Sequence, residues 1–350
     1  MARQSELSER KAAILRALVR HFIRTGEPVG SEALAQSAGL RVSSATIRNE
    51  LASLEELGYL TQPHTSAGRA PTDQAYRFYV DMLPARSRLR DWERRAIVGF
   101  FDEALADIDE ILRGTTHLLS RLTRYASLAL APRARDTAIV RAELISLGSG
   151  TLLLLVFDTG GLERRLIDVP SDATGRDVEK ASRTLMESLV GKTLQEARQT
   201  VEERARSLPE TERTLLGRVK DALHSIEEAA HVEHVFMGGV ANIAADEGFD
   251  RRETLREIYE TLERESAMMR LLRHTAVGQA MQPVAVMIGR ENPLPGMWEA
   301  SVVAAPYGSE GGAVGTIGVV GPTRMDYAAA ISAVRAVAER LSAAVQALHG

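Results

Sequence analysis

The sequence predicts an α+β protein with an N-terminal winged helix-turn-helix head and a sheet domain that is interrupted by a mainly helical insert. Three observations indicate this organisation. Residues 31–71 contain two short helical patterns across a tight turn, followed by a hairpin pattern. Strand patterns occur at 138–169 and again at 283–320, and the stretch between them is mostly helical in its apolar spacing. At 350 residues the chain is long enough for two or three domains.

The domain boundaries follow from these patterns. We expect the head over residues 1–83, then linker helices and the first part of the sheet domain over 84–176. The insert covers 177–274, and the second part of the sheet domain covers 275–350. Because the insert carries no catalytic signature, the simplest interpretation is that it forms the contact between two copies of the chain.

The composition excludes several classes of protein. The chain has no cysteine, so disulfides and thiolate metal sites are excluded. Its longest strongly apolar run, 152–157, is far shorter than the ~20 residues that span a bilayer. The charged N-terminus lacks an apolar signal core. We therefore expect a cytoplasmic protein that has no membrane partner.

The charge is distributed unevenly. The whole chain carries −4, but residues 1–80 hold 10 Lys/Arg and 8 Asp/Glu, which leaves them at +2 and the remainder at −6. A mildly basic head on an acidic body suits DNA binding through a few placed side chains, and does not suit binding through a broad basic surface.

The first helix is expected from Ser8, a plausible N-cap, to Thr25. Gly26 and Pro28 end it, since glycine accepts the left-handed cap conformation and proline cannot continue a helix. Its apolar stripe has the spacing of a scaffold helix and consists of Ile14, Leu15, Leu18, Phe22 and Ile23.

Two further helices form the expected helix-turn-helix. Ser31 is expected to cap the second helix, which stops at Gly39. Ser43 is expected to cap the third helix, which reaches Leu57. The third helix has an apolar inner face of Ile47, Leu51 and Leu54, and an outer face of Ala45, Arg48, Asn49 and Ala52, flanked by Thr46 and Ser53. Short side chains let a helix enter a major groove that is only ~12 Å wide. In isolation an ordinary amphipathic helix is the better interpretation, but the neighbouring helix and hairpin favour a recognition helix.

The hairpin is expected to form the wing, with strands over 59–62 and 69–71. Gly68 supplies freedom for a tight turn, and Arg69 is the wing residue we expect to anchor on the DNA backbone. The full set of expected DNA contacts is Ser31, Arg41, Ser43, Ser44, Thr46, Arg48, Asn49, His64, Ser66 and Arg69.

Beyond the wing, a helix from Thr72 carries three aromatic residues and ends at Pro84, and a helical stripe extends over 92–125. Strands are expected in an antiparallel meander over 138–147, 151–157 and 162–169, and later over 283–289, 300–307 and 313–320, with a short candidate at 232–237 and a last helix over 327–348. We expect the meander and the later strands to belong to one sheet domain.

Chemical motifs are few. Gly312, Gly315, Gly318 and Gly321 recur every third residue, but strand glycines at close backbone contacts explain them better than a phosphate loop. His231 and His234 lack a third metal ligand. We therefore expect no enzyme, no metal and no cofactor.

Three stretches together resemble the heat-inducible transcription repressor family HrcA. They are the head over 28–81, VFMGGVANIA at 235–244, and the stretch 288–334 with its GPTRMDY motif at 321–327. The resemblance implies a homodimeric repressor of chaperone operons that binds double-stranded DNA at an inverted-repeat operator. It also implies a GAF-like sheet domain, an inserted dimerisation domain, and modulation by the GroEL chaperonin.

Two other functions stay open at this point. A metabolite-responsive regulator would use the GAF-like domain as a ligand sensor, and a ligand would then shift both the thermal stability of the body and its DNA affinity. An enzyme carrying a DNA-binding head would show turnover by the isolated body.

Overall fold

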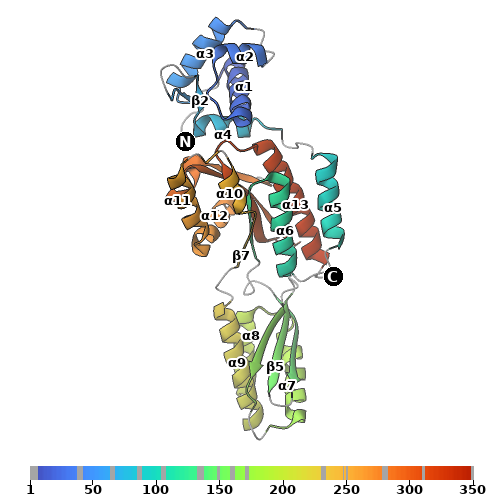
Figure 1. Ribbon diagram of the computed structural model, residues 1–350. Coiled ribbons are helices and arrows are strands. Elements are labelled where there is room, and N and C mark those ends of the chain that lie inside the picture. The colour runs from blue at the N-terminus through green and yellow to red at the C-terminus, as the bar shows by residue number, and fades with distance from the viewer. Residues whose placement is uncertain are drawn as a thin grey trace.

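The computed structural model describes residues 7–37, 42–63, 68–84, 89–103, 108–131, 138–147, 150–157, 162–169, 173–229, 234–246, 248–249, 251–277, 283–309 and 312–347. The chain is elongated (Figure 1). The head lies at one end, a five-stranded sheet with helices on both faces lies in the middle, and a smaller unit of strands and helices lies at the other end.

The head is a helical bundle with a two-stranded wing. Its elements are α1 (Glu9–Thr25), α2 (Ser31–Ser37), α3 (Ser44–Glu56), β1 (Leu60–Thr61), β2 (Ala70–Pro71) and α4 (Asp73–Asp81). As expected, Ser8 caps α1, accepting a hydrogen bond from the Lys11 backbone N–H at 3.4 Å, and Gly26 ends it with φ 72°. The buried face of α1 packs against α3 and α4 in one continuous apolar core.

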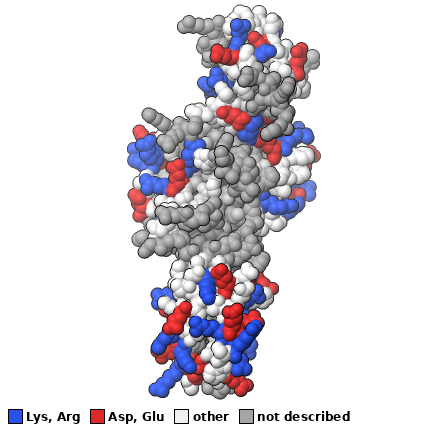
Figure 2. Space-filling model, turned by 180° about the vertical axis from the view of Figure 1, so that it is seen from behind, with Lys and Arg blue, Asp and Glu red and all other residues white. Residues whose placement is uncertain are grey.

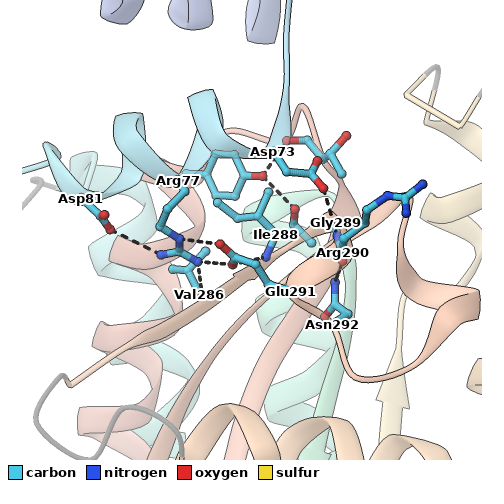
Figure 3. A network of polar contacts seen from close by, with 12 residues as sticks. Asp73, Arg77, Asp81, Val286, Ile288, Gly289, Arg290, Glu291 and Asn292 are labelled. Carbon is cyan, nitrogen blue, oxygen red and sulfur yellow. Dashed lines mark hydrogen bonds and ion pairs between the residues drawn. The ribbon is translucent and has the colours of Figure 1, made fainter. Parts of the chain in front are cut away.

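Helix α4 joins the head to the body (Figure 3). The Arg77 guanidinium donates to both carboxylate oxygens of Glu291 and to the Val286 carbonyl, and its Nε lies 2.8 Å from Glu291 Oε1. On the same helix, Asp73 Oδ2 accepts a hydrogen bond of 3.0 Å from the Arg290 backbone N–H. The head is therefore tied to the segment that follows strand β8 of the central sheet.

The central sheet is antiparallel throughout, in the order β7-β3-β10-β9-β8. Its strands are β3 (Ala126–Leu130), β7 (Val235–Gly238), β8 (Ala285–Ile288), β9 (Ala300–Ser309) and β10 (Gly312–Pro322). Two short 3-10 turns, η2 (Gly289–Glu291) and η3 (Pro295–Met297), connect β8 to β9.

Helices cover both faces of this sheet (Figure 1). One face packs on α6 (Ile108–Thr123) and α13 (Tyr327–Ala347), with α5 (Asp91–Glu103) outside α13. The other face packs on α11 (Arg252–Leu262) and α12 (Glu265–Val277), near the short α10 (Ala241–Ala245). Adjacent residues of β9 point to opposite faces of the sheet and so belong to different cores. Val303 packs on the α13 side, and Val302 packs on the α12 side.

The smaller unit consists of a second sheet and three helices. Strands β4 (Ile139–Ser146), β5 (Thr151–Phe157) and β6 (Leu162–Ile167) pair in sequence order. Helices α7 (Gly175–Leu189), α8 (Leu194–Ala205) and α9 (Glu210–Ala229) cover one face and share a separate apolar core with it. Acidic and basic side chains are interspersed over this unit on the face seen in Figure 2.

The expected grouping of strands is wrong. The meander over 138–169 does not join the sheet of 283–320, because its buried side chains face α7–α9 and form a core of their own. Residues 234–274, which we expected in the insert, instead supply the edge strand β7 and helices that cover the central sheet. The structure therefore places the interruption of the sheet domain between β3 and β7, which are neighbours in the sheet.

Other expectations differ in detail. The helical stripe over 92–125 is two helices, α5 and α6, and α6 packs on the sheet. Strand β3 was not expected, since all five of its residues are buried and it shows no alternation. In β10, an added Cβ would lie 2.4 Å from the Tyr307 ring at Gly315, 2.7 Å from the Val303 carbonyl oxygen at Gly318 and 2.8 Å from the Tyr125 ring at Gly321, which confirms the interpretation of these three glycines as close contacts. Among the described residues, no helix has the length and apolar character needed to cross a membrane.

Candidate nucleic-acid interface

Helix α3 is held in the head by its inner face. Ile47 and Leu54 are fully buried and Leu51 nearly so, as the sequence predicts. The Lys11 ammonium of α1 donates a hydrogen bond of 2.8 Å to Ser53 Oγ on the flank of α3. Apolar packing and this bond fix the orientation of α3, so its opposite face points away from the head.

The first turn of α3 is capped by Ser43, as expected. The Thr46 backbone N–H donates to Ser43 Oγ at 3.1 Å, and the two hydroxyl groups lie 2.9 Å apart. Ser43 itself is exposed. Its hydroxyl already serves the helix terminus, which leaves it capacity for one further partner at most.

The outer face of α3 combines two polar side chains with small ones. Arg48 and Asn49 are exposed, and so are Ala45 and Ala52 on either side of them. The short alanines allow close approach of a groove wall, while guanidinium and amide groups can each form two hydrogen bonds to one base edge. This face has the chemistry of a recognition helix.

Two residues expected at the same surface lie deeper. Ser44 and Thr46 are half-buried at the flank of α3. Ser31 is 8% exposed and is the first residue of α2, not its cap, because the Gly30 carbonyl accepts the first helical bond from the Leu34 N–H. Its hydroxyl therefore faces the head and not the solvent.

The wing forms where the sequence predicts it, with Leu60 opposite Pro71 and Thr61 opposite Ala70. Its base is fastened to the segment before α2 by two backbone bonds between Val29 and Arg69, of 2.9 and 3.0 Å. A Cβ on Gly68 would lie 2.4 Å from the Val29 carbonyl carbon. Glycine is needed there for close backbone approach, and the tip of the tight turn that we expected lies outside the described residues.

Arg69 has a partner within the head. Its Nε lies 2.8 Å from Glu55 Oε2 near the end of α3, and both side chains are partly exposed. This ion pair ties the wing to α3. Arg41 and the expected wing-tip residues His64 and Ser66 lie outside the described residues.

Sequence reasoning missed two groups that position the interface. The Glu55–Arg69 pair joins residues whose proximity depends on the hairpin, so no local pattern reveals it. Thr72 donates its hydroxyl to the carbonyls of Gly58 and Tyr59, at 2.8 and 3.0 Å. A threonine directly before a helix usually indicates a cap, but Thr72 makes no side-chain cap bond and instead clamps the start of the wing.

Comparison with protein families agrees with this arrangement. Residues 6–81 match the model of the winged helix-turn-helix transcription repressor HrcA, DNA-binding. Residues 109–331 match the model of the HrcA protein C-terminal domain. Both matches fall on the parts described above, the head and the two-unit body.

Individual relatives extend over almost the whole chain. The heat-inducible transcription repressor HrcA of Thermobifida fusca is 43% identical over 333 residues, 95% of this chain and 95% of its own length. The repressor of that name from Moorella thermoacetica is 36% identical over 345 residues, covering 98% and 99%. A crystal structure of a hypothetical protein at 26% identity covers 98% of this chain and 100% of its own, with a TM-score of 0.68. On these grounds, the chain belongs to the HrcA family of heat-inducible transcription repressors.

Proposed function

We propose that this repressor acts as a cytoplasmic homodimer on class I heat-shock, or chaperone, operons. Two heads would bind the two halves of an inverted-repeat operator, heat stress would release them, and the GroEL chaperonin would modulate the activity. The single observation that carries DNA reading is the outer face of α3, where exposed Arg48 and Asn49 stand between small side chains beside a wing.

Within this proposal, Arg48 and Asn49 read base edges in the major groove, and Ser43, Ser44 and Thr46 contact phosphates near the helix terminus. The ion pair between Arg69 and Glu55 supports the wing. The Arg69 side chain contacts DNA only if this ion pair breaks.

Pairing of two chains is supported by the uncovered face of the β4-β5-β6 sheet. Cross-strand partners in an antiparallel sheet share a face. Ile145, Leu152 and Leu166 form one row across the three strands, and the register places them on the side away from the helices. Leu166 is 74% exposed and Leu162 is 46% exposed. The row between Leu166 and Leu162 consists of Glu143, Leu154 and Arg164, so charged side chains lie among the apolar ones on the two edge strands. Large exposed apolar side chains gathered on one face, with polar residues around them, often mark a protein–protein interaction site.

A second copy of the chain is the proposed occupant of this face. Two copies related by a two-fold axis would each present the same patch, which is the geometry of most homodimers. The pairing also serves DNA binding, since the head is only mildly basic and two joined heads bind far more tightly than one. The interface would lie at the far end of the molecule from the heads (Figure 1).

Chaperonin modulation is supported by the same surface and by the family resemblance. A protomer without its partner exposes the apolar strand face, and proteins that expose such surfaces are prone to aggregation. Heat that opens the dimer would therefore produce a form that depends on GroEL for return to the paired state.

The metabolite-sensor alternative gains no support from the central sheet itself. In the described part of this domain, buried apolar side chains fill the spaces between the sheet and the helices on both faces.

The proposed function is tested by gel-shift with an inverted-repeat operator from upstream of a chaperonin gene, before and after heating and with and without GroEL. Arg48→Ala and Asn49→Ala should each weaken operator binding by about 1–3 kcal/mol. The matched control is Arg176→Ala, which removes an exposed arginine on α7, far from the head.

Unchanged operator binding by both α3 variants would show that α3 does not read the operator. A wild-type protein that binds no inverted repeat under any of these conditions would refute the proposed function as a whole.

A further inference from the structure

A groove runs between α1 of the head and the body. It has a volume of about 770 Å³, within the usual range for small-molecule sites. One wall is a side of α1 from Ala13 to Arg24, and the opposite wall is the connection from β10 to α13, residues 322–326. Tyr79 of α4 and Tyr125 after α6 also line it.

Arginine dominates the lining. Arg16, Arg20 and Arg24 follow one another at intervals of four on α1, so they lie on one face of the helix, and Arg324 faces them from the body. Four positive charges gathered in one concavity repel each other, and a cleft strengthens the field that they produce. The arrangement is notable in a chain whose net charge is −4.

The two carboxylates of the groove, Asp246 and Asp326, offset only two of the four arginine charges. Asp246 Oδ1 accepts a hydrogen bond of 2.8 Å from the Gly248 N–H, and Asp326 Oδ1 accepts one of 3.1 Å from the Ala329 N–H. Both therefore serve local turns. Over the described part of the chain, no ion pair joins any of the four arginines to an acidic side chain.

Two further groups in the wall are suited to a polar ligand. His21 Nδ1 is buried and has no hydrogen-bond partner among the described residues, an arrangement that costs free energy unless something pairs with it. Arg20 lies close enough to the Tyr79 hydroxyl to lower its pKa, although burial, the larger effect, raises that pKa.

We infer that this groove binds a small anion that carries two or more phosphate groups. Guanidinium groups bind phosphate oxygens in pairs, and arginines on two opposite walls require a ligand with several such oxygens. A groove of about 770 Å³ has the size of a small-molecule site and is far smaller than a duplex, which favours a free small molecule over the DNA backbone.

The bound anion would join the head to the body. It would contact Arg20 on α1 and Arg324 on the β10–α13 connection at once, and so relieve the repulsion between the two walls. Because operator binding also depends on where the heads are held, the two binding events would be coupled, each changing the affinity of the other. This coupling alone rests on the proposed function; the binding of the anion does not.

The test is calorimetric titration of sodium tripolyphosphate into the full-length protein without DNA. We expect one saturable site per chain, with an affinity that falls at least tenfold in Arg20→Gln and in Arg324→Gln. Arg176→Gln on α7, outside the groove, should bind as the wild type does. Circular dichroism of each variant establishes that it is folded, and Arg324→Lys, which keeps the charge, should bind more tightly than Arg324→Gln.

Three results would overturn the inference: no binding of tripolyphosphate at millimolar concentration, equal affinity in the wild type and both glutamine variants, or equal weakening in the Arg176 control. If tripolyphosphate does not bind but the groove variants weaken operator binding, the arginines belong to the DNA backbone and the small-anion site is refuted. Failure of operator binding with intact tripolyphosphate binding would refute the proposed function and leave this site in place.

Discussion

Arg77 on the last helix of the head and Glu291 after strand β8 of the body form a two-pronged ion pair across the joint between these parts (Figure 3). The Ile288 backbone N–H donates a further bond of 2.9 Å to Glu291, so the carboxylate is also fixed to its own segment. Burial alone would lower the pKa of Arg77, but hydrogen bonding to Glu291 and the charges of Glu291 and Asp81 raise it. The pair therefore connects the orientation of the head to the edge of the central sheet.

Removing this pair should destabilise the protein. Arg77→Met should lower the free energy of unfolding by about 1.5–3 kcal/mol, the range for hydrogen bonds to charged groups. Trp298, whose ring lies 5.1 Å from the Arg290 guanidinium, reports on the joint. Urea unfolding followed by its fluorescence, in a Trp92→Phe background, measures the change.

The control for this prediction is Arg256→Met. Arg256 pairs with Glu260 on the same helix, but the side chain is 80% exposed, and such surface pairs contribute little. Equal losses of unfolding free energy in Arg77→Met and Arg256→Met would show that the Arg77–Glu291 pair contributes no more than an exposed surface pair.

The exposed sheet face should determine the oligomeric state. Leu166→Glu places a charge at the most exposed apolar position of this face, where pairing would have to desolvate it. Sedimentation velocity at micromolar concentration should show a dimer for the wild type and a monomer for the variant.

Met186→Glu is the matched control, because Met186 is also exposed but lies on α7, in the helical layer of the same unit. It should remain dimeric. A dimeric Leu166→Glu protein would place the interface elsewhere.

The wing should fail if its base is enlarged. In Gly68→Ala the new methyl group would overlap the Val29 carbonyl, and relief requires the two backbone bonds between Val29 and Arg69 to lengthen. Overpacking of this kind costs about 1–3 kcal/mol. Hydrogen exchange at the Val29 and Arg69 amides should accelerate, and operator affinity should fall with it.

Gly217→Ala provides the comparison for the wing variant. No atom lies within 4 Å of the new methyl group in α9, so this change should stabilise the helix by up to about 1 kcal/mol. Unaltered amide exchange in Gly68→Ala would mean that the wing base adapts without cost.

Stability should fall in alkali because several tyrosines are buried as neutral groups. Burial raises the pKa of Tyr125 to about 12 and raises the pKa of Tyr307 and Tyr327 further. In the unfolded chain a tyrosine loses its proton near pH 10. Above that pH the unfolded state binds fewer protons than the folded state, so the free energy of unfolding decreases as pH rises through the folded values.

Tyrosinate absorbance and circular dichroism in one pH titration check this. Tyr307 donates to the Leu130 carbonyl at 2.8 Å, and Tyr327 lies 2.7 Å from Ser301, so both should ionise only as the fold is lost. Tyr327→Phe should be less stable at neutral pH but less sensitive to alkali. Ionisation of all tyrosines near pH 10 with native circular dichroism would contradict the prediction.

The head could be predicted closely from the sequence. Its caps, Ser8 and Ser43, act within three residues of themselves, and its apolar stripes repeat at helical spacing. The wing strands also pair across a short connection. The sequence could not reveal the burial and the partners of individual side chains. Ser31 is buried, and Arg69 forms an ion pair with Glu55.

The body was less predictable, because a strand pattern identifies which side chains share a face but not which strand lies alongside. Strands β5 and β6 have clear boundaries in the sequence, but their association with α7–α9, and not with β8–β10, depends on burial against helices that come later in the chain. Strand β3, buried on both faces, lacks the alternation that would have identified it.

The sequence by itself therefore determined the DNA-reading head, the family and most of the helices and strands, since these depend on interactions between near neighbours. Tertiary structure alone decided three things: that β3 pairs with β7 across the whole inserted unit, that the described helices α7–α9 all pack on one face of the β4-β5-β6 sheet, and that arginines of α1 meet Arg324 in one groove. All three depend on contacts between residues far apart in the chain, whose proximity is set by which apolar surfaces are buried together, and no local pattern specifies that choice.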